Sequence, residues 1–183
     1  MQIACLGWGS LVWKSGELQI RGKWFEDGPF LPIEFCRQSN NGRITLVLVE
    51  GKQLVRSLWA ILACETLSEA KKNLAERENI KEENIDKHIG FWEKSGKSTG
   101  KYAAVISEWA SKLKLDAVVW TDLPPKFNNK DNKVPTSQEV ISYLKGLSIE
   151  KRRLAEEYIR NAPPQIDTDY RREIMLKLNW LHE

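Results

Sequence analysis

The sequence predicts an α+β fold in which a β-rich first half is followed by a helical C-terminal part. Short apolar runs, separated by glycine and asparagine turns, occupy the first 64 residues and are typical of strands. Two capping boxes, Thr66–Glu69 and Thr136–Glu139, mark the starts of helices. At 183 residues the chain is long enough for one well-packed domain. We expect a single domain over 1–183, with a core over 1–125 and a helical cover over 136–183.

The expected strands are short, and most are joined by short turns. They cover residues 2–6, 31–36, 43–50, 55–64 and 116–121. The run 55–64 is apolar on both faces, which is typical of a central strand that is covered on both sides. Hairpin-like turns such as Asn40–Gly42 join antiparallel neighbours, so we expect an antiparallel or mixed sheet rather than strictly alternating β-α-β units.

The expected helices follow the capping signals. The first begins at Thr66 and points Leu67, Ala70 and Leu74 inward. A short helical patch is expected over 85–92, an exposed loop over 94–101, and a longer helix from about residue 102. The proline-containing segment 122–135 is expected to be a linker or a flap. Three further helices are expected to start at Thr136, at Ser148, and at Asp167 or Thr168.

The charge balance argues against nucleic-acid and membrane partners. Lys and Arg number 28 and Asp and Glu number 25, which leaves a net charge of only +3. The longest uninterrupted apolar stretch, 58–64, is far shorter than the roughly 20 residues that a membrane-spanning helix needs. The N-terminus has neither the basic lead nor the cleavage site of a signal peptide. We therefore expect a cytoplasmic protein.

The cysteines do not form a disulfide or metal-binding pattern. Cys5, Cys36 and Cys64 are odd in number, widely separated and each embedded in an apolar run, as expected of buried thiols in a reducing compartment. The chain has only two histidines, so we expect no metal site and no metal cofactor.

A glycine-containing loop follows the first strand and is the first candidate for a binding site. In Gly7-Trp8-Gly9-Ser10 the glycines allow tight turns that can aim successive N–H groups at a carboxylate or phosphate. Val12 stands where a dinucleotide-binding motif has its third glycine, so that motif is excluded. An ordinary turn at the end of a strand is the alternative.

Glu78 is the candidate catalytic residue. At 100° per residue, position 78 lies within about 20° of Leu67, on the apolar stripe of the helix, whereas Glu76 lies on the opposite face. Burial and the negative end of the helix dipole would both raise the pKa of Glu78 toward the range of a general base. The alternative is that the helix ends earlier and Glu78 points into water.

Arg37 and Ser39 form the third candidate feature, at the end of the second expected strand. An arginine and a hydroxyl at a strand end can bind an anion, although a surface salt bridge is the alternative. His88 shares a face with apolar residues, which is typical of a packed histidine. Cys36 has no histidine nearby in the sequence to activate it as a nucleophile.

Two of these motifs resemble the γ-glutamylcyclotransferase-like family. Its Tyr-Gly-Ser motif after the first strand corresponds to Trp8-Gly9-Ser10-Leu11, and its glutamate at a helix end corresponds to Glu78 within the stretch 74–79. The resemblance covers about the first 125 residues and extends to the helical tail of larger, uncharacterised bacterial members. It implies a small mixed, barrel-like sheet with flanking helices and a helical C-terminal extension.

The resemblance also implies a reaction without a cofactor. The α-amine of a γ-glutamyl amine or peptide would attack its own γ-carbonyl and release 5-oxoproline and an amine, with Glu78 as general base. Gly7, Trp8, Gly9, Ser10, Leu11, Arg37 and Ser39 would bind the substrate. Trp8 replaces the family's tyrosine, and Asn79 replaces a glycine. A non-catalytic module that binds a small anion or a peptide end is the alternative function, and a homodimer is an open alternative to a monomer.

Overall fold

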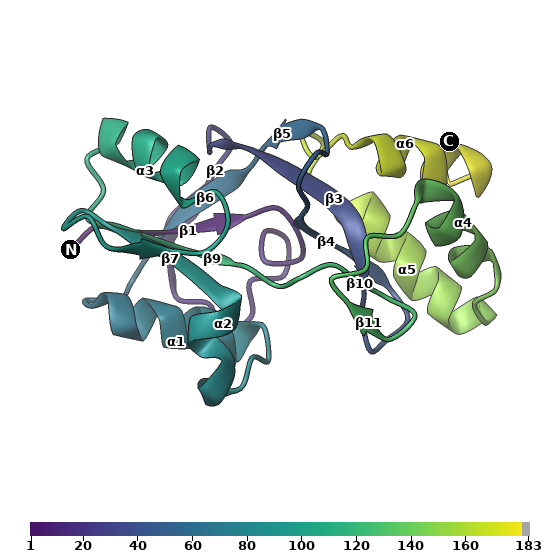
Figure 1. Ribbon diagram of the computed structural model, residues 1–183, viewed down its shortest axis with the longest axis horizontal. Coiled ribbons are helices and arrows are strands. Elements are labelled where there is room, and N and C mark those ends of the chain that lie inside the picture. Colours follow the sequence, from purple (N-terminus) through teal and green to yellow (C-terminus); the bar gives the residue numbers. More distant parts are fainter. Residues whose placement is uncertain (181–183) are drawn as a thin grey trace. The chain divides into compact units, whose positions relative to one another are not determined.

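The computed structural model describes residues 1–180 and has a mixed α+β architecture (Figure 1). Among these residues it contains two mixed β-sheets and six α-helices. The chain divides into two compact units, 1–31 with 56–123 and 32–55 with 124–183, and each is described by itself. The expectation of a single domain over 1–183 stays a prediction.

The first unit is built on a six-stranded sheet with the order β2-β6-β1-β9-β7-β8. Its strands are β1 (Ile3–Gly7), β2 (Ile20–Phe25), β6 (Leu58–Leu62), β7 (Ile89–Glu93), β8 (Ser98–Thr99) and β9 (Ala117–Thr121). β1 runs parallel to β9 and antiparallel to β6, so the sheet is mixed. Because β1 and β9 are parallel, the loops that follow them leave from the same edge of the sheet.

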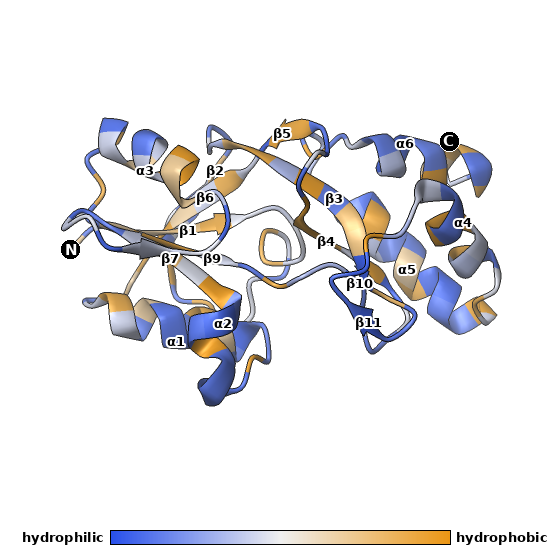
Figure 2. Cartoon of the chain, in the orientation of Figure 1, coloured by the Kyte–Doolittle hydropathy of each residue, from blue (hydrophilic) through white to orange (hydrophobic). Residues whose placement is uncertain are grey.

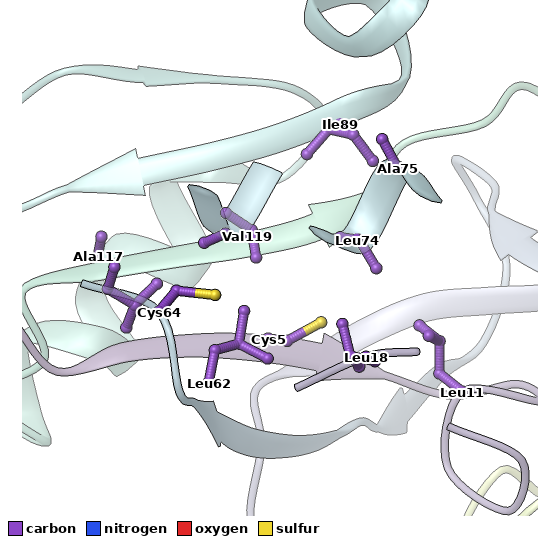
Figure 3. Close-up of a cluster of buried hydrophobic side chains, with 12 residues drawn as sticks. Cys5, Leu11, Leu18, Leu62, Cys64, Leu74, Ala75, Ile89, Ala117 and Val119 are labelled. Atoms are coloured by element: carbon purple, nitrogen blue, oxygen red, sulfur yellow. The ribbon is translucent and has the colours of Figure 1, made fainter. Parts of the chain in front are cut away.

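Helices cover both faces of this sheet. α1 (Leu67–Arg77) and α3 (Ala103–Lys112) lie on opposite sides of it (Figure 1). A short 3-10 turn, η1 (Glu82–Asn84), and the short α2 (Ile85–His88) lead from α1 into β7. Figure 3 shows the apolar cluster beneath α1, in which Cys5 of β1 and Val119 of β9 lie near Leu74 and Ala75 of the helix. This packing fixes the C-terminal end of α1 close to the exit of β1.

The second unit combines a five-stranded sheet with three helices. The sheet has the order β11-β10-β3-β4, and β5 also pairs with β3. Its strands are β3 (Phe30–Gln38), β4 (Ile44–Leu48), β5 (Leu54–Arg56), β10 (Lys126–Phe127) and β11 (Lys130–Asp131). The helices are α4 (Ser137–Lys145), α5 (Ile149–Asn161) and α6 (Asp169–Lys177). α5 packs on β4, and both α5 and α6 contact α4.

Local sequence signals account for where the helices begin. Thr66 and Thr136 both form complete capping boxes with the glutamate three residues later. The hydroxyls of Ser148 and Thr168 accept N–H groups at the starts of α5 and α6. In Figure 2 these helices carry hydrophilic and hydrophobic residues on different faces, as expected of helices that cover a core on one side.

Several sequence-based expectations need correction. The strands form two mixed sheets, so the expected barrel-like sheet is not closed. The expected strand 55–64 is interrupted at Ser57, whose N–H and hydroxyl both donate to the carbonyl of Pro29. Residues 89–93 form β7 instead of continuing a helix, and β2 was not predicted. The segment 122–135 contains the small β10–β11 hairpin, which Figure 2 shows as largely hydrophilic.

The helices of the described residues differ from membrane-spanning helices. In residues 1–180 no helix combines the length and the apolar character that crossing a bilayer requires.

Candidate functional site

The end of α1 fixes the backbone of Glu78. Glu78 is the C-cap residue, and Asn79 follows it with a left-handed φ of 54°. The N–H of Asn79 donates to Glu76 O at 3.1 Å, and the N–H of Ile80 donates to Ala75 O at 2.8 Å. This pair of bonds is the Schellman arrangement that ends many helices. The chain therefore turns sharply just after Glu78, at a position set by backbone hydrogen bonds.

Arg77 joins this helix end to the loop that follows β1. Its Nε donates to the carbonyls of Lys14 and Ser15 at 3.1 and 3.0 Å, and its Nη2 donates to Lys14 O at 2.7 Å. Nη2 also donates to Ser10 Oγ at 3.1 Å, while Nη1 lies 3.2 Å from Glu78 Oε1. One guanidinium thus connects the candidate base to the candidate anion-binding loop.

The carboxylate of Glu78 lies at the exit of β1 and is mostly enclosed. Its side chain is 20% exposed, so the alternative in which it points into open water does not hold. Its charge is close enough to act on the buried thiol of Cys5 in β1: burial is the main cause of the raised pKa of Cys5, and the negative charge of Glu78 adds to it. The helix ends at Arg77, one residue before Glu78, so Glu78 is a cap rather than part of the last turn.

The loop after β1 is wound into a helix-like turn. The N–H of Val12 donates to Gly9 O at 3.0 Å, the N–H of Lys14 donates to Ser10 O at 2.8 Å, and the hydroxyl of Ser15 donates to Leu11 O at 2.7 Å. None of the backbone hydrogen bonds of residues 1–180 uses the N–H groups of Gly9, Ser10 or Leu11 as donors. Donors at the start of such a turn point in similar directions and can be met by an anion.

Other residues of the loop have packing roles. A Cβ on Gly7 would lie 2.6 Å from the ring of Trp24, so glycine is needed there for close packing. The side chains of Trp8 and Leu11 are 3% and 4% exposed, and Leu11 belongs to the apolar cluster beneath α1. The loop therefore offers its backbone and the Ser10 hydroxyl to a ligand, rather than a broad aromatic wall at Trp8.

Arg37 and Ser39 lie in the second unit. Nη1 of Arg37 donates to Pro124 O at 2.6 Å, and burial lowers the pKa of this half-buried guanidinium. The hydroxyl of Ser39 is enclosed and has no hydrogen-bond partner among the described residues. Neither residue is in an ion pair of residues 1–180, so the surface salt bridge considered from the sequence is not formed there.

Sequence reasoning missed Arg77, the residue that assembles the site. Its place beside Glu78 was visible, but the carbonyls that it binds lie more than 60 residues earlier in the chain. All three cysteines are free and buried, in agreement with the expectation of buried thiols. Within residues 1–180, no three His, Cys, Asp or Glu side chains are grouped so that they could hold a metal ion.

Comparison with known proteins gives this chain no relative. No family model matches it, and neither a curated protein nor a solved structure does so. The resemblance to γ-glutamylcyclotransferase-like proteins therefore stays a prediction.

Proposed function

We propose that the chain is a γ-glutamylcyclotransferase-like enzyme that converts a γ-glutamyl amine or peptide into 5-oxoproline and the free amine. The observation that carries the proposal is the arrangement at the exit of β1: the Glu78 carboxylate is connected through Arg77 to Ser10, in a loop whose first N–H groups have no backbone acceptor. A base and a set of anion-binding donors are the two groups that this cyclisation requires.

Glu78 is the general base in this proposal. At neutral pH the substrate's α-amine is an ammonium and cannot attack a carbonyl until it loses a proton. The ionised carboxylate of Glu78 takes that proton. The guanidinium of Arg77, 3.2 Å away, holds this carboxylate beside the loop that follows β1.

The loop N–H groups stabilise the charge that develops during ring closure. The amine nitrogen forms a bond to the γ-carbon, and the γ-carbonyl oxygen becomes an oxyanion that the N–H groups of Gly9, Ser10 and Leu11 are suited to bind. Glu78 passes the proton that it removed to the nitrogen of the scissile amide, and the amide C–N bond breaks as the carbonyl re-forms. The attacking nitrogen loses its second excess proton to become the lactam N–H, and the released amine takes up that proton as an ammonium. Because the nucleophile is part of the substrate, orientation contributes much of the rate, and no covalent enzyme intermediate is needed.

The test is direct detection of 5-oxoproline by mass spectrometry after incubation with a panel of γ-glutamyl amines and dipeptides. We expect Glu78→Gln to lower kcat/KM by about 100-fold or more, the usual contribution of a general base. Glu76→Gln is the matched control, because Glu76 is an exposed glutamate of the same helix. Equal activity of Glu78→Gln and the wild type would remove Glu78 from this role.

A binding module is the second candidate, and the contact between Glu78 and Arg77 favours it. A carboxylate held by a guanidinium can serve to position the loop without taking part in chemistry. In that case the panel would give no 5-oxoproline, while γ-glutamyl compounds would still raise the Tm of the protein. The same two measurements on one panel separate the two functions.

A further inference from the structure

The turn that joins β3 to β4 has two polar residues, Ser39 and Arg43, at the point where the strands meet it. We call this residue pair the neck of the hairpin. The N–H of Ser39 donates to Arg43 O at 2.8 Å, and the N–H of Gly42 donates to Ser39 O at 3.0 Å. Gly42 has a φ of +81°, which closes the turn tightly. Ser39 and Arg43 are therefore opposite residues of the hairpin, and the side chains of opposite residues lie on the same face of a sheet.

Arg43 is a partly buried arginine whose Nε has no hydrogen-bond partner among the described residues. Its Nε is enclosed and has no hydrogen-bond partner within residues 1–180, and none of the ion pairs in that part of the chain includes Arg43. The guanidinium lies over the ring of Tyr158, 5.3 Å from its centroid. A ring beneath the guanidinium contacts its flat face and uses none of the N–H donors at its edge.

Ser39 repeats the same pattern on the other side of the neck. Its Oγ is enclosed and has no partner among the described residues. Burying a polar group without a partner costs free energy, and a partly buried guanidinium and a hydroxyl in this condition at one turn are unusual. Both groups can donate a hydrogen bond, so a ligand with several acceptor oxygens suits this pair.

The surroundings of the turn are basic. Arg37 stands two residues before Ser39, and Lys126 of β10 pairs with Arg37 in the sheet. A Cβ on Gly42 would lie 3.3 Å from Cδ of Lys151, at the start of α5. Asp131 is the acidic group that acts on Arg37, and it partly opposes the lowering of the Arg37 pKa by burial. The charges around the turn therefore favour a negatively charged ligand.

We infer that the neck of the β3–β4 hairpin binds an oxyanion, a carboxylate or a phosphate group, through the Arg43 guanidinium and the Ser39 hydroxyl. Two donors of the planar guanidinium match two oxygens of such a group, and the hydroxyl adds a third hydrogen bond. The inference pairs Ser39 with Arg43, whereas the sequence alone paired it with Arg37. It rests on residues of the second unit and does not depend on the proposed role of Glu78.

Isothermal titration calorimetry at fixed, low ionic strength tests this, with inorganic phosphate and L-glutamate as separate probes. We expect saturable binding of at least one probe, and the two titrations show whether the site prefers phosphate or carboxylate. Arg43→Gln should weaken binding at least tenfold, and Ser39→Ala should weaken it several-fold. Arg43→Lys should recover only part of the affinity, because it keeps the charge but loses the planar fork.

The matched control is Arg153→Gln, which removes one exposed positive charge from α5 in the same unit. An equal loss of affinity in Arg153→Gln and Arg43→Gln would show attraction by net charge alone and would overturn the inference. So would binding that survives Arg43→Gln, or no binding of either probe. Repeating the titration in Glu78→Gln separates the two proposals, because oxyanion binding should persist there while 5-oxoproline formation is lost.

Discussion

Two carboxylates of this chain lie at opposite ends of helices, and their environments differ in a way that distinguishes structure from chemistry. Glu34 of β3 lies at the N-terminus of α6, where the helix dipole favours negative charge. It accepts hydrogen bonds from Phe35 N at 2.8 Å, Thr168 Oγ1 at 2.5 Å and Tyr170 N at 3.2 Å. Its residue is 1% exposed, so its bonding is directed to holding α6 on the sheet.

Glu78 shows the reverse pattern. It caps the C-terminus of α1, where the dipole opposes negative charge, and a neighbouring arginine compensates for this. One-fifth of its side chain remains exposed, so a ligand can reach it. A carboxylate surrounded by donors at a favourable helix end is a structural group, whereas one kept at an unfavourable end and left accessible is a candidate for chemistry.

The largest expected effect on stability is that of Glu34→Ala. The substitution leaves the Thr168 hydroxyl and the Tyr170 N–H buried without their acceptor, and we expect the free energy of unfolding to fall by about 3 kcal/mol. Urea denaturation of the variant and the wild type measures this change in the free energy of unfolding. Glu50→Ala removes an exposed glutamate of the same unit and should change stability by less than about 0.5 kcal/mol. Similar values for the two variants would contradict a structural role for Glu34.

Arg77→Met should have the second largest effect on stability. It removes the bonds to the carbonyls of Lys14 and Ser15 while keeping much of the side chain's apolar bulk. We expect the free energy of unfolding to fall by about 2 kcal/mol, since two backbone acceptors lose a charged donor. Lys72→Met, on the same helix but with only an exposed ion pair to Glu82, is the control. A loss below about 0.5 kcal/mol would show that Arg77 does not fix the loop.

Asn79 tests whether the position of Glu78 depends on the turn that follows it. A left-handed φ of 54° costs an alanine more than it costs asparagine or glycine. Asn79→Ala should therefore lower the free energy of unfolding by about 1 kcal/mol, whereas Asn79→Gly should change it by less than about 0.5 kcal/mol. Equal effects of the two variants in urea denaturation would mean that the backbone conformation is not the constraint.

The parts of the fold that the sequence predicted are those set by local signals. The capping boxes at Thr66 and Thr136 start helices in the structure as expected, because they are complete within four residues. Helix geometry placed Glu78 on the buried stripe of the helix, whereas in the structure it is the C-cap residue and its side chain is 20% exposed. Residues 89–92 belong to the expected helical patch because Ile89 and Trp92 have helical spacing, yet pairing with β9, more than 20 residues later, makes them part of a strand.

The partners of the two carboxylates could not be predicted, because they come from distant parts of the chain. Thr168 and Tyr170 lie more than 130 residues after Glu34, and Ser10 lies 67 residues before Arg77. Arg43 and Ser39 show the same limit in another form. The sequence reveals an arginine and a serine, but not that Arg43 Nε and Ser39 Oγ have no hydrogen-bond partner within residues 1–180. The missing charge partner becomes visible only once the elements are assembled.

The smallest expected effect is the dependence of the free energy of unfolding on pH. The sign of this dependence shows how the environment of Glu34 acts on its carboxylate. Burial raises the pKa of Glu34 above its ordinary value of 4.5, although its hydrogen bonds to Thr168, Phe35 and Tyr170 oppose the rise. The folded chain therefore holds a proton at a pH where the unfolded chain has released it. The contribution of Glu34 to stability is complete below pH 4.5 and is lost as the pH rises through the raised pKa.

Glu34→Gln should remove this decline, so that the free energy of unfolding, measured by urea denaturation from pH 4 upward, falls less steeply than in the wild type.

Glu139 should change the free energy of unfolding with pH in the opposite direction. The backbone N–H of Thr136 and the ammonium of Lys133 lower the pKa of Glu139, so its contribution is present above pH 4.5 and is lost as the pH falls through the lowered value. Glu139→Gln should therefore change the slope only below pH 4.5. A Glu34→Gln profile parallel to the wild type would mean that burial does not control this carboxylate, and the contrast with Glu78 would lose its physical basis.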